Sequence, residues 1–479
     1  MLFSSIEFIF LFLPIVFILY FVAGKHRKSW AMPILVLASL FFYGYWKPIY
    51  LPLIITSTLV NFYLGRLIAP KRGVNNKKIL VIGVMLNAGF LVIFKYTDFI
   101  LENTNLIFNT NYPMLGIILP LAISFFTFQQ IAYLVDRYNG IAGNYTLLEY
   151  FLFVTFFPQL IAGPIVHHKE MMPQFKALKN ANINYTNIEK GIAIFSIGLF
   201  KKLIIADYFG GFADKGYAEV SSLNFWGAWS TSLSYTIQLY YDFSGYCDMA
   251  IGAALLFNIK LPINFNSPYK AISIQDFWRR WHITLSTWLR DYIYIPLGGN
   301  RNGNFKTYRN LFITFVLGGI WHGAGWGFFI WGVLHGLGLM LHRVWQKYDI
   351  AMPNFIAWLI TMLYVHLTWV FFRADNLADA NIIIIKLFSL SDIFKTNISQ
   401  NLFVNYHLIG SVEGINGPYI ALLGLFLFVI SATTKNTIEL MQASMIEKKR
   451  TAFLAALSLS AGILALLGNS SQTFLYFNF

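Results

Sequence analysis

Two histidines, His282 and His322, each directly follow a tryptophan in segments that are otherwise mostly apolar. A neutral imidazole near pH 7 can take a proton from a hydroxyl and return it to a leaving group, as acyl transfer requires. The sequence contains no Gly-x-Ser-x-Gly nucleophile elbow, P-loop or dinucleotide-binding fingerprint. Any reaction that this chain catalyses is therefore expected to depend on histidine.

His322 lies in a glycine-rich stretch, with glycines at positions 318, 319, 323, 325 and 327. Glycines at this density let backbones approach closely or let a helix end, so a substrate could come near the imidazole. The alternative is a histidine that only forms a hydrogen bond across a helix interface. The local sequence leaves both readings open.

Three histidines, His282, His322 and His335, could in principle bind a metal. No acidic residue sits at metal-ligand spacing from them, and the single cysteine, Cys247, excludes zinc boxes built from cysteine. We therefore expect no metal. His335 is expected to pack between helices, and His342 to mark a helix end on the cytoplasmic side.

Residues 275–292 are predicted to form the amphipathic helix that positions His282. The aromatic residues of one face recur at spacings of four, seven and four: Phe277, Trp281, Trp288 and Tyr292. Arginines 279, 280 and 290 could reach lipid headgroups or an anionic ligand. An interfacial helix with a tryptophan belt explains these residues as well, but it does not explain the histidine.

The composition is that of an integral membrane protein, with 57% of residues hydrophobic and only 12% charged. Soluble domains carry about 25% charged residues. The 479 residues give room for about a dozen spans of ~20 residues. We therefore predict an all-α polytopic membrane protein, organised as a single membrane domain over 1–479. The net charge of +14 lies mostly in short loops, so the positive-inside bias explains it and no nucleic-acid partner is expected.

Apolar segments are predicted at 7–24, 30–47, 50–67, 79–95, 113–135, 147–165, 190–206, 225–257, 310–320, 325–342, 354–372, 417–433 and 451–468. The positive-inside rule places the basic loops at 25–28, 71–78 and 169–179 in the cytoplasm, which puts the 98–112 loop and both termini outside. The first apolar run is followed, not preceded, by its positive cluster. It is therefore expected to be a retained span rather than a cleaved signal peptide.

Two apolar segments are predicted to be broken. Segment 147–165 must enter and leave on the same side to satisfy the topology, and its two prolines and glycine at 158–164 suit a re-entrant piece. Segment 225–257 contains Asp242 and Asp248, which makes an all-lipid environment implausible. We therefore expect a second break near 241–248.

Several motifs together resemble the membrane-bound O-acyltransferase superfamily, and most closely its bacterial branch that O-acetylates alginate or peptidoglycan. They are the Asp-Phe-Trp-Arg-Arg-Trp-His run at 276–282, the Ser-Thr-Trp-Leu-Arg-Asp-Tyr run at 286–292, residues 295–301, Trp-His-Gly at 321–323, residues 158–164 and Asp-Phe-Ser-Gly-Tyr at 242–246. The hydrophobic layout matches along the whole chain. Trp-His-Gly alone would not be specific, but the set is.

The resemblance implies an all-α ring of about 11–13 transmembrane or re-entrant helices around a central funnel or tunnel, with a catalytic core at about 113–345. His322 would be the catalytic base and His282 its partner. The donor would be cytoplasmic acetyl-CoA, held by Arg279, Arg280, Trp281 and Trp321. The acetyl group would leave on the other side of the inner membrane, where a separate periplasmic transferase of the SGNH type places it on a polysaccharide.

The aromatic segment 474–479, Phe-Leu-Tyr-Phe-Asn-Phe, resembles a C-terminal signature of envelope acylation systems. In related D-alanylation machinery the signature sits on a separate peptide whose tyrosine is thought to carry the acyl group. The resemblance therefore implies that Tyr476 is an internal acyl acceptor, placed outside by the predicted topology. The alternative is that the aromatic tail anchors at the membrane interface.

Two other functions are weighed against this one. D-alanyl transfer to teichoic acid keeps the chemistry, but the fused aromatic tail argues against it. A transporter or channel with histidines along a polar path is a remote alternative, because no internal repeat is evident. Between alginate and peptidoglycan, the abundance of Phe, Ile, Asn and Lys hints at an AT-rich genome and favours peptidoglycan weakly.

Overall fold

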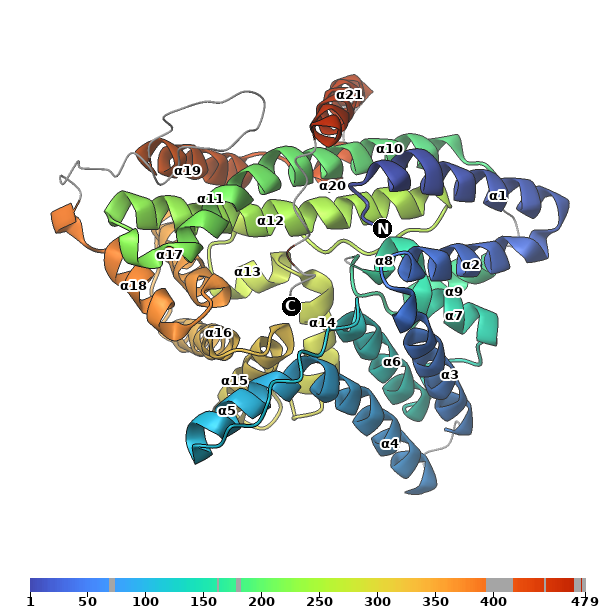
Figure 1. Cartoon of the computed structure of the whole chain (residues 1–479), viewed down its shortest axis with the longest axis horizontal. Coiled ribbons are helices and arrows are strands. Elements are labelled where there is room, and N and C mark those ends of the chain that lie inside the picture. Colours follow the sequence, from blue (N-terminus) through green and yellow to red (C-terminus); the bar gives the residue numbers. More distant parts are fainter. Residues whose placement is uncertain are drawn as a thin grey trace. The chain divides into compact units, whose positions relative to one another are not determined.

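The computed structural model describes residues 1–68, 74–161, 163–177, 182–392, 417–442, 445–468 and 475. These residues are mostly helical and contain no β-strand, which confirms the predicted all-α class (Figure 1). They form two compact units, each treated separately below. The first comprises Met1–Phe195 with Tyr246–Pro262, and the second Ser196–Gly245 with Ile263–Phe479.

Six helices within the described ranges are long and apolar enough to cross a membrane: Glu7–His26, Pro48–Leu67, Asn75–Phe108, Trp326–Trp345, Asn354–Arg373 and Lys449–Leu467. Two shorter apolar helices, Lys28–Gly44 and Pro418–Thr433, are present as well. A chain with this many apolar helices buries its backbone polar groups within each helix, as a bilayer demands. The protein is therefore a multi-pass membrane protein.

The first unit is built mainly from helices of the N-terminal part of the chain. They are α1 (Leu13–His26, preceded by a π turn at Glu7–Phe12), α2 (Ala31–Gly44), α3 (Leu51–Leu67), α4 (Val74–Leu91), α5 (Thr97–Phe108), α6 (Ile123–Tyr138), α7 (Leu147–Thr155), α8 (Phe157–Leu160), α9 (His168–Ala177) and most of α10 (Tyr185–Phe200). A π segment, Val92–Tyr96, joins α4 to α5 without a loop. The predicted 98–112 loop is therefore helical as far as Phe108, and the predicted 113–135 segment becomes helical only at Ile123.

The predicted break in segment 147–165 is present. Helix α7 ends at Thr155, and Phe156 leaves the helical region with φ −47° and ψ 110°. Pro158 then sits in the first turn of the short helix α8, where its missing N–H costs nothing. The sequence therefore interrupts this segment where the prolines stand.

The second unit carries every histidine of the Trp-His segments. Its helices are the end of α10 with a π segment at Lys201–Ala206, α11 (Asp207–Ala218), the first part of α12 (Phe225–Leu256), α13 (Ile274–Arg280), α14 (Ile283–Leu289), a π turn at Arg290–Tyr294, α15 (Asn304–His322), α16 (Trp326–Trp345), α17 (Asn354–Arg373), α18 (Leu377–Leu387), α19 (Gly417–Thr433), α20 (Thr437–Met441) and α21 (Met445–Leu467).

Helix α12 is continuous over 32 residues, so the break predicted near 241–248 is wrong. The buried carboxylate of Asp242 does not need an irregular backbone because it is neutralised by Lys202, whose Nζ lies 2.8 Å from Asp242 Oδ1. Gly245 allows this approach: a Cβ at Gly245 would lie 2.8 Å from the carbonyl oxygen of Gly198 on α10. The polar motif is accommodated by close helix packing.

Helices α15 and α16 lie side by side, and glycines make their contact possible (Figure 1). A Cβ built on Gly319 would lie 2.8 Å from Gly332 Cα, and one on Gly332 would lie 2.6 Å from the Phe315 carbonyl oxygen. Small residues therefore let the two backbones touch. Because His322 is the last residue of α15, this contact also fixes the position of His322.

Candidate active site

The predicted helix 275–292 is interrupted at the histidine, so the prediction of one continuous helix is wrong. Helix α13 ends at Arg280, and α14 starts at Ile283. Between them His282 adopts the left-handed conformation, with φ 43° and ψ 54°. A non-glycine residue held there is strained, and such strain concentrates at functional sites. The interruption places the imidazole at a corner of the backbone rather than on a helix face.

Asn264 fixes the orientation and the tautomer of the His282 ring. Asn264 Oδ1 accepts hydrogen bonds from the N–H and the hydroxyl of Thr284, at 3.2 and 2.9 Å, so this atom is the carbonyl oxygen. His282 Nδ1 lies 3.1 Å from the same oxygen and must therefore donate its hydrogen to it. The lone pair of the neutral imidazole is then on Nε2, which has no hydrogen-bond partner within the described parts of the chain.

The surroundings of His282 keep it uncharged. Its side chain is fully buried, and the ring of Phe243 meets it edge-on with centroids 4.8 Å apart. Burial lowers the pKa of His282 to about 3 because the charged form loses its hydration. His282 is therefore a neutral proton or hydrogen-bond acceptor at physiological pH.

His322 ends α15 inside a cage of aromatic rings. Its ring centroid lies 4.9 Å from those of Trp321 and Trp331, and 5.2 Å from that of Phe372. The side chain of His322 is buried, with 3% exposure. The neighbouring Trp321, expected at the donor site, is also buried, at 8% exposure.

One aromatic cluster, formed by Trp281, Trp331 and Trp369, is contacted by His322 directly and by His282 through an intervening ring. Ring centroids are 5.0 Å apart between Trp281 and Trp369, and 5.8 Å apart between Trp331 and Trp369. His322 contacts Trp331 directly, and His282 is joined to Trp281 through the ring of Phe265. This tryptophan cluster links the two Trp-His segments in the second unit.

His335 has the structural role that the sequence predicts for it. Trp278 Nε1 can only donate, and it lies 3.1 Å from His335 Nδ1, so Nδ1 accepts. His335 Nε2 then carries the hydrogen and donates to the hydroxyl of Thr368 at 3.0 Å, which in turn donates to the Val365 carbonyl at 2.7 Å. Both ring nitrogens are occupied, so this imidazole bridges α13, α16 and α17.

The two arginines proposed for the donor lie in different surroundings. Arg280 Nε is 2.9 Å from Asp276 Oδ1, one helical turn earlier, and this ion pair occupies the guanidinium. Arg279 is exposed and lines a pocket of about 790 Å³. Trp281 is 1% exposed and packs face to face on Phe277, so it belongs to the core around the pocket rather than to its wall.

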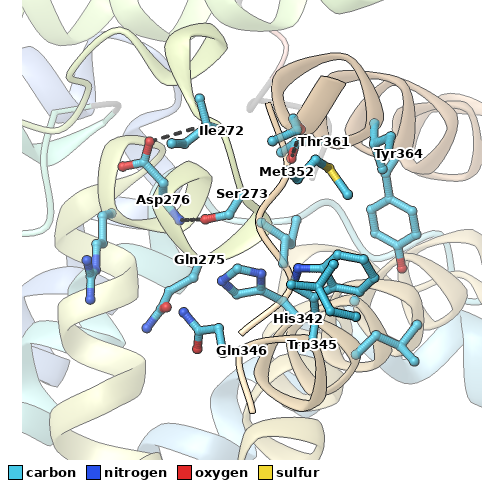
Figure 2. A pocket seen from close by; sticks show the side chains of 17 residues that line it. Ile272, Ser273, Gln275, Asp276, His342, Trp345, Gln346, Met352, Thr361 and Tyr364 are labelled. Atoms are coloured by element: carbon cyan, nitrogen blue, oxygen red, sulfur yellow. Dashed lines mark hydrogen bonds between the residues drawn. The ribbon is translucent and has the colours of Figure 1, made fainter. Parts of the chain in front are cut away.

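The pocket lies between α13, the C-terminal half of α16 and the N-terminal half of α17 (Figure 2). Its walls are largely apolar, with Leu341, Trp345 and Met352 among them. Polar groups gather toward α13 and the end of α16, where Gln275 and His342 lie. The volume falls within the ~300–1,000 Å³ usual for small-molecule sites. An elongated ligand with one charged end fits this distribution.

Sequence reasoning missed a buried ionic cluster on α10–α12. Lys202 Nζ lies 2.6 Å from Asp207 Oδ1 and 2.8 Å from Asp242 Oδ1, and all three side chains are at most 2% exposed. Asp242 Oδ2 accepts the backbone N–H of Leu475 at 2.9 Å. Lys202 falls in the predicted apolar segment 190–206, and a lysine in the interior of that segment was the signal that a buried partner must exist. Tyr476 itself lies outside the described residues.

A second polar cluster, in the first unit, has metal-ligand chemistry. Asp136 Oδ2 lies 2.9 Å from His167 Nε2 and 2.7 Å from His168 Nε2. The other ring nitrogens are also engaged: His167 Nδ1 accepts the Lys169 N–H at 3.2 Å, and His168 Nδ1 lies 2.9 Å from the Tyr145 hydroxyl. Both Nε2 atoms therefore act as donors to the carboxylate in this arrangement. The absence of a resident metal stays a prediction.

Electrostatics of this cluster follow from its hydrogen bonds. Burial by itself would raise the pKa of Asp136, but the hydrogen bonds from His167 and His168 outweigh it and hold the pKa well below its usual range. Burial lowers the pKa of His168, against the opposing effect of the Asp136 hydrogen bond. The cluster is thus an ionised carboxylate that accepts hydrogen bonds from two imidazoles.

Comparison with known proteins shows one family along this chain. The family model for membrane-bound O-acyltransferases matches residues 138–374. The chain is 48% identical to a peptidoglycan O-acetyltransferase of Helicobacter pylori, over 100% of this chain and 98% of that protein. It is 40% identical to a probable alginate O-acetylase of Pseudomonas aeruginosa, over 83% of this chain and 78% of that protein.

A more distant similarity extends over part of the chain. A teichoic acid D-alanyltransferase of Streptococcus thermophilus is 29% identical over 47% of this chain and 57% of that protein. The family match includes both Trp-His segments, the tryptophan cluster and the pocket beside Arg279. The chain therefore belongs to the membrane-bound O-acyltransferase family and is an acyltransferase of the membrane.

Proposed function

We propose that the protein moves acetyl groups from cytoplasmic acetyl-CoA across the inner membrane, for O-acetylation of a cell-envelope polysaccharide by a periplasmic partner. Peptidoglycan is the polysaccharide that we favour. The relative named for peptidoglycan is 48% identical over the whole of this chain, whereas the relative named for alginate is 40% identical over 83% of it.

The observation that carries this proposal is the Asn264–His282 pair. Its geometry holds a neutral imidazole with Nε2 unprotonated in a fully buried position. Acyl transfer to oxygen needs such a group, because a hydroxyl becomes an adequate nucleophile only when a base takes its proton. The tryptophan cluster joins this imidazole to His322, so two imidazoles serve one buried region.

In the reaction that we infer, His322 takes the proton of the acceptor hydroxyl, which is the phenol of Tyr476. The phenol oxygen attacks the thioester carbonyl carbon, the C–O bond forms, and the C–S bond breaks. The imidazolium then returns its proton to the departing thiolate. A free phenol with a pKa of ~10 would be a poor nucleophile without such a base. The single hydrogen of the reacting hydroxyl goes to His322, so His282 has a positioning role, with its Nε2 lone pair accepting a hydrogen bond from another donor group of the bound substrate.

The acetyl-tyrosine then gives its acetyl group to the partner, a periplasmic transferase of the SGNH type. A phenyl ester is a more reactive acyl donor than an alkyl ester, so this second transfer to a sugar hydroxyl is favourable. The scheme places the donor side in the cytoplasm and both chain termini in the periplasm. The basic loops at 25–28 and 169–179 support that orientation through the positive-inside rule.

The pocket beside Arg279 is where we place the pantetheine arm of the donor. Its volume and apolar walls suit an extended chain, and Arg279 stands at its polar side where a phosphate would lie. Arg280 supports the site indirectly, because its ion pair with Asp276 fixes the turn from which Arg279 projects. Trp281 and Trp321 contribute buried aromatic surface behind the reacting centre.

The test is intact-protein mass spectrometry after incubation of the purified protein with acetyl-CoA. Wild type is compared with Tyr476→Phe and His322→Ala, each checked for expression and membrane insertion. One acetyl mass is expected on wild type and on neither variant. An acetyl adduct that persists in Tyr476→Phe would overturn the relay, and normal polysaccharide acetylation by His322→Ala would overturn the assigned base. Labelling by a D-alanyl donor in place of acetyl-CoA would assign the cargo of the teichoic acid systems.

A further inference from the structure

The ionic cluster of Lys202, Asp207 and Asp242 holds more negative than positive charge. One ammonium faces two carboxylates, at 2.6 and 2.8 Å, and the side chains are at most 2% exposed. Burying charge is costly, and the excess is tolerated only when the remaining carboxylate oxygens receive hydrogen bonds. One carboxylate therefore needs a donor from elsewhere in the chain.

That donor is a backbone N–H far away in the sequence. Leu475 N–H lies 2.9 Å from Asp242 Oδ2, across 233 positions of the chain. The Leu475 side chain is itself buried, with 9% exposure. Charge-assisted hydrogen bonds of this kind are about twice as strong as neutral ones. Asp242 thus uses one oxygen for Lys202 and the other for the chain segment at 475.

The next residue on α12 connects this contact to the candidate active site. Phe243 follows Asp242 directly, and its ring meets His282 with centroids 4.8 Å apart. Consecutive residues of a helix are separated by about 1.5 Å along its axis. Tyr476 is covalently tied to Leu475, with Cα atoms ~3.8 Å apart across a trans peptide. On one side of the hydrogen bond, Leu475 directly precedes the tyrosine in the sequence. On the other side, Asp242 directly precedes Phe243, whose ring packs on His282.

We propose that the cluster of Lys202 and Asp242 is a docking site for the chain segment around Leu475, and that Asp242 is a positioning residue that delivers Tyr476 to the histidines. The second half of this inference rests on the acyl-tyrosine function proposed above; the first half does not. Asp242 binds the segment through its backbone, so the site selects an extended chain with a free N–H rather than a particular side chain.

The test measures amide hydrogen exchange of the peptide spanning 469–479 in the full-length protein, without any donor. Asp242→Ala keeps Lys202 paired with Asp207 in a one-to-one ion pair, so the variant is expected to fold. Loss of a hydrogen bond to a charged group should speed exchange in this peptide about tenfold or more. Exchange in helices α15 and α16 should stay unchanged, which a general loss of stability would not allow.

Two matched pairs of variants separate docking from packing. Leu475→Pro removes the donor N–H and should speed exchange of the remaining amides, whereas Leu475→Ala retains the N–H and should change exchange little. Asp207→Asn removes a carboxylate from the same ammonium without touching Leu475, and exchange in the peptide should remain slow. Equal exchange in Asp242→Ala and wild type would overturn the docking site.

The acetyl adduct provides the second readout in the same variants. Asp242→Ala and Leu475→Pro should lower the initial rate of adduct formation on Tyr476 about tenfold, with Leu475→Ala near wild type. Faster exchange with an unchanged adduct rate would overturn the positioning role and leave the docking site standing. If wild type forms no adduct, the acyl-tyrosine function fails, while the exchange data still decide whether the segment docks on Asp242.

Discussion

Asn264 Oδ1 lies 3.1 Å from His282 Nδ1 and so dictates which nitrogen of that ring carries the hydrogen. The same oxygen accepts hydrogen bonds from both the N–H and the hydroxyl of Thr284, and these bonds prevent the side-chain amide of Asn264 from flipping. An imidazole oriented in this way presents Nε2 as an acceptor, as oriented histidines do in hydrolytic enzymes. Asn264 acts through His282 and is a positioning residue.

Asn264→Ala is expected to lower kcat about tenfold to a hundredfold, because a buried Nδ1–H loses its acceptor and the ring can change tautomer. Asn264→Asp should keep the orientation but add a negative charge beside Nδ1–H. Burial now lowers the pKa of His282 to about 3, and a neighbouring carboxylate raises a histidine pKa. The acid limb of the pH–rate profile should therefore move to higher pH in Asn264→Asp. A profile that superimposes on wild type would show that the protonation state of His282 does not limit the reaction.

His335 is expected to matter for stability and not for chemistry. Its two nitrogens are occupied by Trp278 and Thr368, so His335→Ala leaves the buried Trp278 Nε1–H without an acceptor, removes one of the hydrogen bonds of the Thr368 hydroxyl and creates a cavity between three helices. The free energy of unfolding should fall by about 2–4 kcal/mol. The apparent midpoint of thermal unfolding in detergent measures this change.

The control for His335 is the activity of the folded fraction. At a temperature below both midpoints, His335→Ala should retain the kcat of wild type, whereas His322→Ala should lose activity with its midpoint nearly unchanged. Loss of turnover in correctly folded His335→Ala would assign the imidazole to the reaction instead of to the helix interface.

The glycine contact between α15 and α16 predicts that a substitution away from the candidate active site lowers activity. A Cβ at Gly319 would lie 2.8 Å from Gly332 Cα and would force the two helices apart. His322 lies about one turn after Gly319 on α15, so this movement would displace its imidazole. Gly319→Ala should lower activity about a hundredfold, because misplacement of a catalytic group by ~1 Å has costs of that size. Gly318→Ala is the matched control, since its Cβ would meet only the Leu289 side chain at 3.3 Å. Similar activities of the two variants would argue against a role of this contact in placing His322.

The fold class and the histidine pair could be anticipated from the sequence, and the contacts that orient them could not. The composition and the apolar segments predict an all-helical membrane protein. The two Trp-His pairs in apolar surroundings identify the two imidazoles. Nothing in a linear pattern indicates that His282 adopts a left-handed conformation, because its neighbours alone favour a helix. Its partner Asn264 lies 18 residues earlier, outside any periodic segment.

The continuity of α12 was unpredictable for a related reason. Asp242 in an apolar segment indicates either a broken helix or a buried cation, and only the fold shows that Lys202 supplies the cation. A lysine within an apolar segment is a signal of the same kind, but pairing the two requires knowledge of how α10 packs on α12. Gly245 was visible in the sequence, whereas its contact with the Gly198 carbonyl oxygen was not.

Arg279 is expected to contribute to donor affinity and not to turnover. Arg279→Gln should raise KM for acetyl-CoA about tenfold and leave kcat unchanged, because a phosphate contact that is the same in ground and transition states alters binding alone. An acetyl thioester of pantetheine lacks the phosphates, so wild type and variant should use it equally well. An identical tenfold difference with both donors would mean that Arg279 shapes the pocket rather than binding phosphate.

The Asp136–His168 contact predicts how stability depends on pH. Burial lowers the pKa of His168, so the unfolded chain binds a proton more readily than the folded one as the pH falls below the ordinary histidine value of ~6.5. Stability is therefore present above that pH and decreases on acidification. His168→Gln cannot titrate; its unfolding midpoint should be lower at pH 7.5 but should fall less between pH 7.5 and 5.5 than that of wild type. Without this one proton uptake, the free energy of unfolding changes with pH less steeply, by up to ~1.4 kcal/mol per pH unit. Parallel pH dependences of the two midpoints would show that His168 is not a source of the acid sensitivity.

Tyr145→Phe, which removes only the hydroxyl beside His168 Nδ1, should lower the midpoint while keeping the slope, since the titrating imidazole remains.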